Sequence, residues 1–400
     1  MRRTALLCIV LAGLVAGPAM PAAAGWRGRI DRIVRGREMG VAVRLDGRIL
    51  YERNARTKRV PASNEKLLLT MALFDHLAPS TRLVTRAGVP SVSGGTVKGN
   101  LFVLGSGDPA VAGGGSFAKS LPFKPTRLRL LARRIKGAGV ERITGRVIGS
   151  THYFSHDWFA PGWKSYYPQQ YVPLASALTY NGNAHRGRHI SDPELRAARA
   201  LTKKLESIGV RVRRAPRAGA PRPGLEHIAR VQSQPLRALV RYMNRRSSNF
   251  FAEVLGKRLG VARYGQPGTI AKAGAAIQSW ANTHGVGVKA YDGSGLSYQN
   301  HVSPYGLVRL LGVAENEPRA GAVKGSLPKG GQGTLEDRLR GTPVRAKTGT
   351  LTNVSALSGW VWMKRRDEWG TFSIMSRGMD KPHAVDLEDR IVKILNQRAR

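Results

Sequence analysis

Cysteine and acidic residues are scarce in this chain. Its 400 residues include one cysteine, Cys8, which lies close to the N-terminus. A single thiol excludes an internal disulfide framework, a cysteine-based zinc finger and an iron–sulfur cluster. Asp and Glu number 25 against 65 Lys and Arg, so the formal net charge is +40 at pH 7. This excess predicts attraction to polyanions such as nucleic acids, anionic cell-wall polymers and acidic membrane surfaces.

Long apolar runs and repeats are also missing, apart from one apolar segment at residues 5–16. That run follows Met1-Arg2-Arg3 and precedes Ala22-Ala23-Ala24, the pattern of a secretory signal peptide. It is short for a bilayer span of about 20 residues, although an uncleaved anchor remains the alternative. We therefore expect residues 1–24 to be a signal peptide, the protein to be secreted to the periplasm or the exterior of the envelope, and no specific nucleic-acid partner.

The remaining sequence is typical of a folded α+β protein. Hydrophobic residues make up 42% and charged residues 22%, and no Gly-X-Y period or heptad run is present. Alternation and turn signals predict strands at residues 39–45, 49–51, 96–104, 143–148, 346–351, 356–363 and 371–376. Helical spacing predicts helices from residue 63, at 127–136, 235–243 and 249–259, and near the C-terminus. Residues 211–224 contain five Arg and three Pro without periodicity, which indicates an exposed linker.

The first chemical motif is Ser63-Asn64-Glu65-Lys66. On a helix, residues three apart share a face, so the Lys66 amine can reach the Ser63 hydroxyl. A hydroxyl needs an adjacent base to become a nucleophile, and a lysine with a lowered pKa can be that base. The same spacing recurs at Ser116 and Ser326, but only Ser63 opens a long apolar helix.

Two more motifs follow in order. Ser247-Ser248-Asn249 offers a hydroxyl that can relay a proton and an amide that can hold a carbonyl, although a helix N-cap is its simpler interpretation. Lys347-Thr348-Gly349-Thr350 offers a cation, hydroxyls and a glycine that leaves room for a ligand backbone, or simply a turn between strands. The ordered set of three motifs is the signature of penicillin-binding proteins and β-lactamases.

With these motifs, the chain resembles the class C low-molecular-mass penicillin-binding proteins, the secreted D-Ala-D-Ala carboxypeptidases and endopeptidases of peptidoglycan. Residues 99–101, 107–109, 176–178, 233–236 and 292–297 also match the family's flanking segments. The resemblance implies a β-lactamase/transpeptidase-like catalytic domain, an antiparallel sheet flanked by helices, at residues 25–82 and 227–400. Residues 83–226 would form a smaller inserted α+β domain and a return linker.

The resemblance also implies the chemistry. Ser63 would form the acyl-enzyme, Lys66 would act as base, and Ser247 with Lys347 would return the proton to the leaving amine. Asn249 would position the acyl side, and Thr348, Gly349 and Thr350 would bind substrate. No metal or organic cofactor is required. The expected partners are peptidoglycan peptide stems, β-lactams as covalent inhibitors and, by charge, anionic envelope polymers.

Three alternatives remain open. Tyr166-Tyr167 stand where an acidic residue can bind a diaminopimelate amine, so the preferred third residue of the stem stays open. His152, His156 and Asp157 have spacing that could bind a metal, but a structural role is favoured because no further ligand follows. Finally, a decayed site would leave a noncatalytic, basic cell-surface protein that binds polymers.

Overall fold

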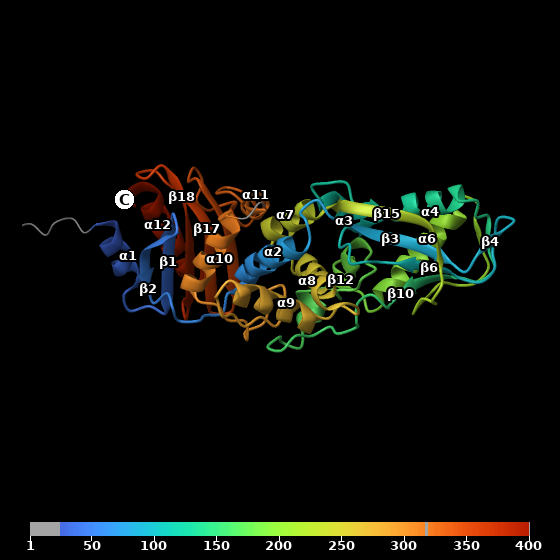
Figure 1. The fold of residues 1–400 in the computed structure, drawn as a ribbon, viewed down its shortest axis with the longest axis horizontal. Coiled ribbons are helices and arrows are strands. Elements are labelled where there is room, and N and C mark those ends of the chain that lie inside the picture. Colours follow the sequence, from blue (N-terminus) through green and yellow to red (C-terminus); the bar gives the residue numbers. More distant parts are fainter. Residues whose placement is uncertain (1–24, 317–318, 400) are drawn as a thin grey trace, which may run out of the picture.

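The computed structural model describes residues 25–316 and 319–399, so the expected signal peptide lies outside the described residues. The described chain is elongated, with one sheet at each end and a layer of helices between them (Figure 1). No helix in these residues is long and apolar enough to cross a bilayer.

The first sheet is antiparallel and combines both ends of the chain in the order β16-β17-β18-β1-β2. Its strands are β1 (Met39–Leu45), β2 (Arg48–Arg53), β16 (Val344–Leu351), β17 (Val354–Met363) and β18 (Glu368–Arg377). Helices α1 (Trp26–Val34) and α12 (Lys381–Arg398) pack together, with α12 on β17, while α10 (Pro304–Asn316) packs on β1 and β18. Strand β17 is therefore buried along nearly its whole length, on both faces.

The middle layer is built around α2 (Glu65–His76), which begins directly after the 3₁₀ turn η1 (Ala62–Asn64). Every α2 residue from Glu65 to Phe74 is buried, as expected for a helix that neighbours enclose on all sides. Those neighbours are α7 (Leu236–Arg246), α8 (Asn249–Tyr264), α9 (Ile270–Thr283) and α11 (Ala320–Ser326). The helix that follows Ser63 is thus fixed at the centre of the protein.

The second sheet has the order β14-β10-β6-β3-β15 and is mixed, because β10 runs parallel to β6 and β14. Its strands are β3 (Arg82–Val89), β6 (Leu101–Leu104), β10 (Val147–Ser150), β14 (Arg217–Gly219) and β15 (Glu226–Pro235). Helices α4 (Leu128–Gly137) and α6 (Pro193–Glu206) pack against each other and onto this sheet. The resulting core is separate from those of the other two layers.

Short elements complete the described chain. A small sheet contains β4 (Val92–Ser93), β5 (Thr96–Val97), β9 (Arg142–Ile143) and β13 (Arg211–Val212). The others are β7 (Val111–Ala112), α3 (Gly115–Ser120), β8 (Thr126–Arg127), α5 (Tyr167–Gln170), η2 (Asn181–Asn183), β11 (Ala184–His185), β12 (Arg188–His189) and η3 (Gly333–Leu335).

The α+β architecture predicted from the sequence is confirmed, with three differences in detail. Residues 211–224 are not simply a linker, because β13 pairs with β9 and β14 pairs with β10. These strands, the second sheet and its helices α4 and α6 form what we call the second part of the protein. The second sheet extends past residue 226, since β15 buries Ala229 and Val231 in its core. Helices α9, α10 and α11 were not predicted.

Candidate active site

Ser63 lies in a tight turn held between two glycines. The residue before it, Ala62, has a φ of 47°, a left-handed conformation that a non-glycine residue adopts only when its surroundings impose it. A Cβ at Gly295 would lie 1.9 Å from the Ala62 carbonyl oxygen, and one at Gly349 would lie 2.7 Å from that of Pro61. The side of Gly349 on which a Cβ would project is thus filled by the turn that carries Ser63.

The Lys66 ammonium joins three segments of the site. Its Nζ donates to Ser63 Oγ at 2.9 Å, to Asn249 Oδ1 at 2.9 Å and to the Ser294 carbonyl oxygen. The side chain is completely buried at the start of α2. Two of the three predicted motifs therefore converge on one amine.

Burial sets the protonation of this amine. Desolvation lowers the pKa of Lys66 to about 8, against the opposing effect of Asp292, Glu253 and Glu65. A neighbouring cation would also lower this pKa, but the charged groups that affect it are these three carboxyl groups. Desolvation and Asp292 also raise the pKa of Glu253 to about 8 and that of Glu65 well above its ordinary range. Protonation of Glu253 at neutral pH weakens its hold on the Lys66 proton.

Lys347 repeats this arrangement on the other side of Ser63. Its Nζ donates to Ser247 Oγ at 2.9 Å and to the Thr348 carbonyl oxygen at 2.7 Å. Desolvation, then Lys66 and Lys381, lower the pKa of Lys347 well below its usual value. Ser247 has a φ of 52° at the C-terminal cap of α7, so its backbone is held in a sparsely populated conformation. The third motif lies in strand β16 and not in a turn.

These groups surround a cleft of about 670 Å³. Its lining includes five of the predicted residues, Ser63, Ser247, Asn249, Thr348 and Thr350. Lys66 and Lys347 are buried beneath the cleft and act on it through the hydroxyl groups of the two serines.

One motif of this kind could arise by chance, but a match along the chain decides the family. Residues 30–188 and 181–398 match the D-Ala-D-Ala carboxypeptidase 3 (S13) family. The chain belongs to the S13 peptidase family. It is therefore a serine-type D-Ala-D-Ala carboxypeptidase by family, and the resemblance to penicillin-binding proteins is confirmed.

Individual relatives agree with this assignment. A carboxypeptidase of Mycobacterium tuberculosis is 29% identical over 398 residues, which cover 92% of this chain and 83% of the relative. A D-alanyl-D-alanine carboxypeptidase of Actinomadura is 26% identical and covers the same shares. The crystal structure of penicillin binding protein 4 from Haemophilus influenzae has a TM-score of 0.78 at 19% identity, over 92% of this chain and 99% of that one. That last likeness shows the shared fold.

A buried loop behind the S13 site supports Lys66, a role that the motifs did not predict. Asp292 accepts hydrogen bonds from Gly295 N and Ser297 N, both at 2.8 Å, and from Trp163 Nε1 at 2.6 Å. This holds the loop that presents the Ser294 carbonyl oxygen to Lys66. Residues 292–297 were recognised only as a family segment, because the partner Trp163 is distant in sequence.

The two ends of the S13 cleft differ in chemistry. Beside Thr348 and Thr350 the lining includes Arg338 and Lys381, neither of which was predicted. At the other end, Tyr166, Tyr167 and Tyr171 form a cluster of aromatic rings, and the Tyr171 carbonyl oxygen accepts from Asn249 Nδ2 at 3.2 Å. The cleft is thus cationic beside Gly349 and aromatic beside Asn249 and Leu351.

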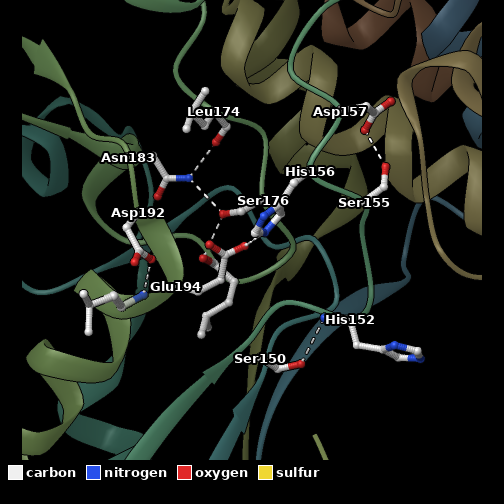
Figure 2. A network of polar contacts seen from close by, with 12 residues as sticks. Ser150, His152, Ser155, His156, Asp157, Leu174, Ser176, Asn183, Asp192 and Glu194 are labelled. Atoms are coloured by element: carbon white, nitrogen blue, oxygen red, sulfur yellow. Dashed lines mark hydrogen bonds and ion pairs between the residues drawn. The ribbon is translucent and has the colours of Figure 1, made fainter. Parts of the chain in front are cut away.

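The histidines considered as metal ligands belong to a different network (Figure 2). His156 Nε2 lies 3.2 Å from Glu194 Oε1, and its ring stacks on Trp158 at 4.9 Å. Asp157 instead pairs with the buried Lys257 at 2.7 Å. Within residues 25–316 and 319–399, no group of three or more His, Cys, Asp or Glu side chains is arranged to hold a metal ion.

Proposed function

We propose that this protein cleaves the terminal D-Ala-D-Ala bond of peptidoglycan stem peptides through a Ser63 acyl-enzyme, and the equivalent bond of D-Ala cross-links. The observation that carries the proposal is the 2.9 Å contact between Ser63 Oγ and a buried Lys66 amine whose pKa is about 8. A lysine in that range is neutral often enough at physiological pH to accept a proton.

In the first half-reaction, neutral Lys66 takes the Ser63 proton as Oγ attacks the carbonyl carbon of the penultimate D-Ala. The backbone N–H groups of Ser63 and Thr350 would stabilise the oxyanion. The C–N bond then breaks, and the proton taken from Ser63 passes from Lys66 through Ser247, which is hydrogen-bonded to Lys347, to the leaving amine, so Lys66 is neutral again and Ser247 keeps its hydroxyl proton. In the second half-reaction, water attacks the Ser63 ester and releases the shortened peptide.

Charge fixes the direction of the bound peptide. Lys381 lies beside Gly349 and Lys347 lies beneath the cleft, whereas Arg338 is already paired with Glu388 and Asp389. The C-terminal carboxylate of the substrate is therefore attracted to the two lysines. A carboxylate beside Lys347 would also raise the lowered pKa of its amine and so favour the charged pair. The acyl part of the substrate then runs towards Asn249 and Tyr171.

We also propose a secreted location and attachment to anionic envelope polymers. At the far end of the second part, Arg142, Arg211 and Arg213 line a hollow of about 380 Å³. Nearby, desolvation and the charges of Arg217 and Arg214 lower the pKa of Arg146. Like charges gathered this closely repel one another, and a bound polyanion would relieve that repulsion.

The noncatalytic alternative is less well supported, because Ser63, Lys66, Ser247 and Lys347 are all present and hydrogen-bonded in pairs. Labelling with a fluorescent penicillin distinguishes the two. We expect a covalent band that Ser63→Ala abolishes and the matched change Ser207→Ala, on the exposed end of α6, leaves intact. An unlabelled wild-type protein with a normal thermal melt would contradict the proposed enzyme.

A further inference from the structure

A second groove, of about 410 Å³, lies next to the active-site cleft. It is formed where α3, η2 and the β11–β12 hairpin meet α7 and α8, at the junction of the helical layer with the second part (Figure 1). Its lining includes Ser116, Phe117, Ser120, Asn181, Arg186 and Ser248. We call this the junction groove.

The junction groove adjoins the cleft through α8. Asn249 lines the cleft, and its neighbours Ser248 and Phe250 line the groove. The wall between them is the segment that leads from Tyr171, which accepts from Asn249 Nδ2, to Pro173, which lines the groove. A ligand that extends past Asn249 therefore reaches the groove within a short distance.

The polarity of the substrate determines which part arrives there. Its C-terminal carboxylate is drawn to the part of the cleft beside Lys347 and Lys381, so its N-terminal side passes Asn249. In peptidoglycan, the N-terminus of the stem peptide carries the sugar chain. The groove thus lies on the carbohydrate side of the bond that is cleaved.

The lining suits a sugar. The Phe117 ring lies over Gly182, where an added Cβ would come within 2.7 Å of it, and the ring remains half-buried at the groove. Aromatic rings stack on the apolar faces of sugars, while Ser116, Ser120 and the Arg186 guanidinium supply hydrogen-bonding groups for hydroxyl and carbonyl oxygens. Both Ser116 and Ser120 are exposed, so these groups are accessible.

We infer that the junction groove is a subsite for the sugar that carries the stem peptide, with Phe117 stacking on it and Arg186 donating to its oxygens. This inference rests on the proposed function, because the reaction at Ser63 sets the position of the peptide. It assigns to the second part of the protein a role in recognising glycan-linked substrate over free peptide.

The test measures binding without turnover. Calorimetry with the Ser63→Ala protein compares a disaccharide-pentapeptide with the same pentapeptide lacking the sugars. We expect the sugars to lower Kd by about tenfold, as one stacking contact and one hydrogen bond would do. Phe117→Ala or Arg186→Ser, added to Ser63→Ala, should abolish this difference. Arg188→Ser, which removes an exposed arginine of the same hairpin outside the groove lining, should leave it intact.

Equal Kd values for the two ligands, or a sugar-dependent gain that survives both groove substitutions, would overturn the inference. The proposed function is tested separately by penicillin labelling of the wild-type protein. Binding to Ser63→Ala needs no acylation, so the calorimetry still tests the groove even if the wild-type protein fails to label with penicillin. A fall in affinity for both ligands alike would also contradict a sugar subsite, since it would place Phe117 or Arg186 on the peptide.

Discussion

The pH dependence of acylation follows directly from the burial of Lys66. With a pKa of about 8 in place of 10.5, its amine is neutral in roughly one-tenth of the molecules at pH 7 and roughly nine-tenths at pH 9. The lowered pKa raises the neutral fraction at pH 7 by about 300-fold over an ordinary lysine. If neutral Lys66 is the base, the acylation rate must follow this fraction.

We therefore expect the second-order rate of penicillin acylation to rise about tenfold from pH 7 to pH 9 and to level off above pH 8. Stopped-time labelling with a fluorescent penicillin across this range, beside a thermal melt at each pH, measures it. Lys66→Arg, which keeps the charge but cannot lose its proton, should acylate at least about 100-fold more slowly and still fold.

Two results would refute this reasoning. A rate that is unchanged between pH 7 and pH 9 would mean that no base with this pKa limits acylation. A near-wild-type rate for Lys66→Arg would remove Lys66 from proton transfer, whatever the pH profile shows.

Three further predictions test other features. Glu65 is buried, its carboxyl oxygens have no hydrogen-bond partner among the described residues, and its pKa is raised. Folding therefore favours its protonated form, and ionisation of the unfolded chain lowers stability as pH rises from about 5. The stability of Glu65→Gln relative to wild type, measured by denaturant melts, should then increase by at most about 1.4 kcal/mol per pH unit. The exposed control Glu52→Gln should show no such increase. The same pH dependence for Glu65→Gln and wild type would contradict this prediction. Trp163→Phe removes a 2.6 Å hydrogen bond to Asp292, so it should lower stability by about 1.5–3 kcal/mol and slow acylation. Wild-type values for both the thermal melt and the acylation rate would show that Trp163 does not support the loop. Cosedimentation with isolated cell wall should weaken as salt is raised, while peptide turnover changes little. Binding should also weaken when four clustered arginines are changed to serine (Arg211, Arg213, Arg214 and Arg217), but not when four other exposed arginines are changed (Arg365, Arg366, Arg377 and Arg398). Binding that survives both molar salt and the first set of changes would refute the electrostatic account.

The sequence predicted local patterns well and long-range support poorly. The hairpin at residues 39–51 and the helix after Ser63 were predicted correctly, because alternation and helical spacing are local signals. Strand β15 was missed because its alternate buried positions include Ala229 and Ser233, which carry little hydrophobic signal. Helix α9 is rich in Ala, which carries little hydrophobic signal, so its apolar periodicity is weak.

The candidate site divides in the same way. The motif residues could be identified because each motif is short and their order is specific to the family. The contribution of Trp163 to the Asp292 loop, and the positions of Arg338 and Lys381 in the cleft, depend on contacts between distant segments. Only the folded chain reveals such contacts, since neither residue of a pair is unusual in its own segment.

The interleaving of the two chain ends in the first sheet has a consequence for when the enzyme becomes active. Strand β1, near the start of the described chain, pairs with β18, near its end, and the Lys347 amine lies in β16. During synthesis Ser63 and Lys66 emerge early, but neither the cationic end of the cleft nor the closing strand exists until the last residues follow. The order of the chain thus delays catalysis until β16–β18 have been made, and a shorter product carries Ser63 and Lys66 without Lys347 or the strands that complete the first sheet.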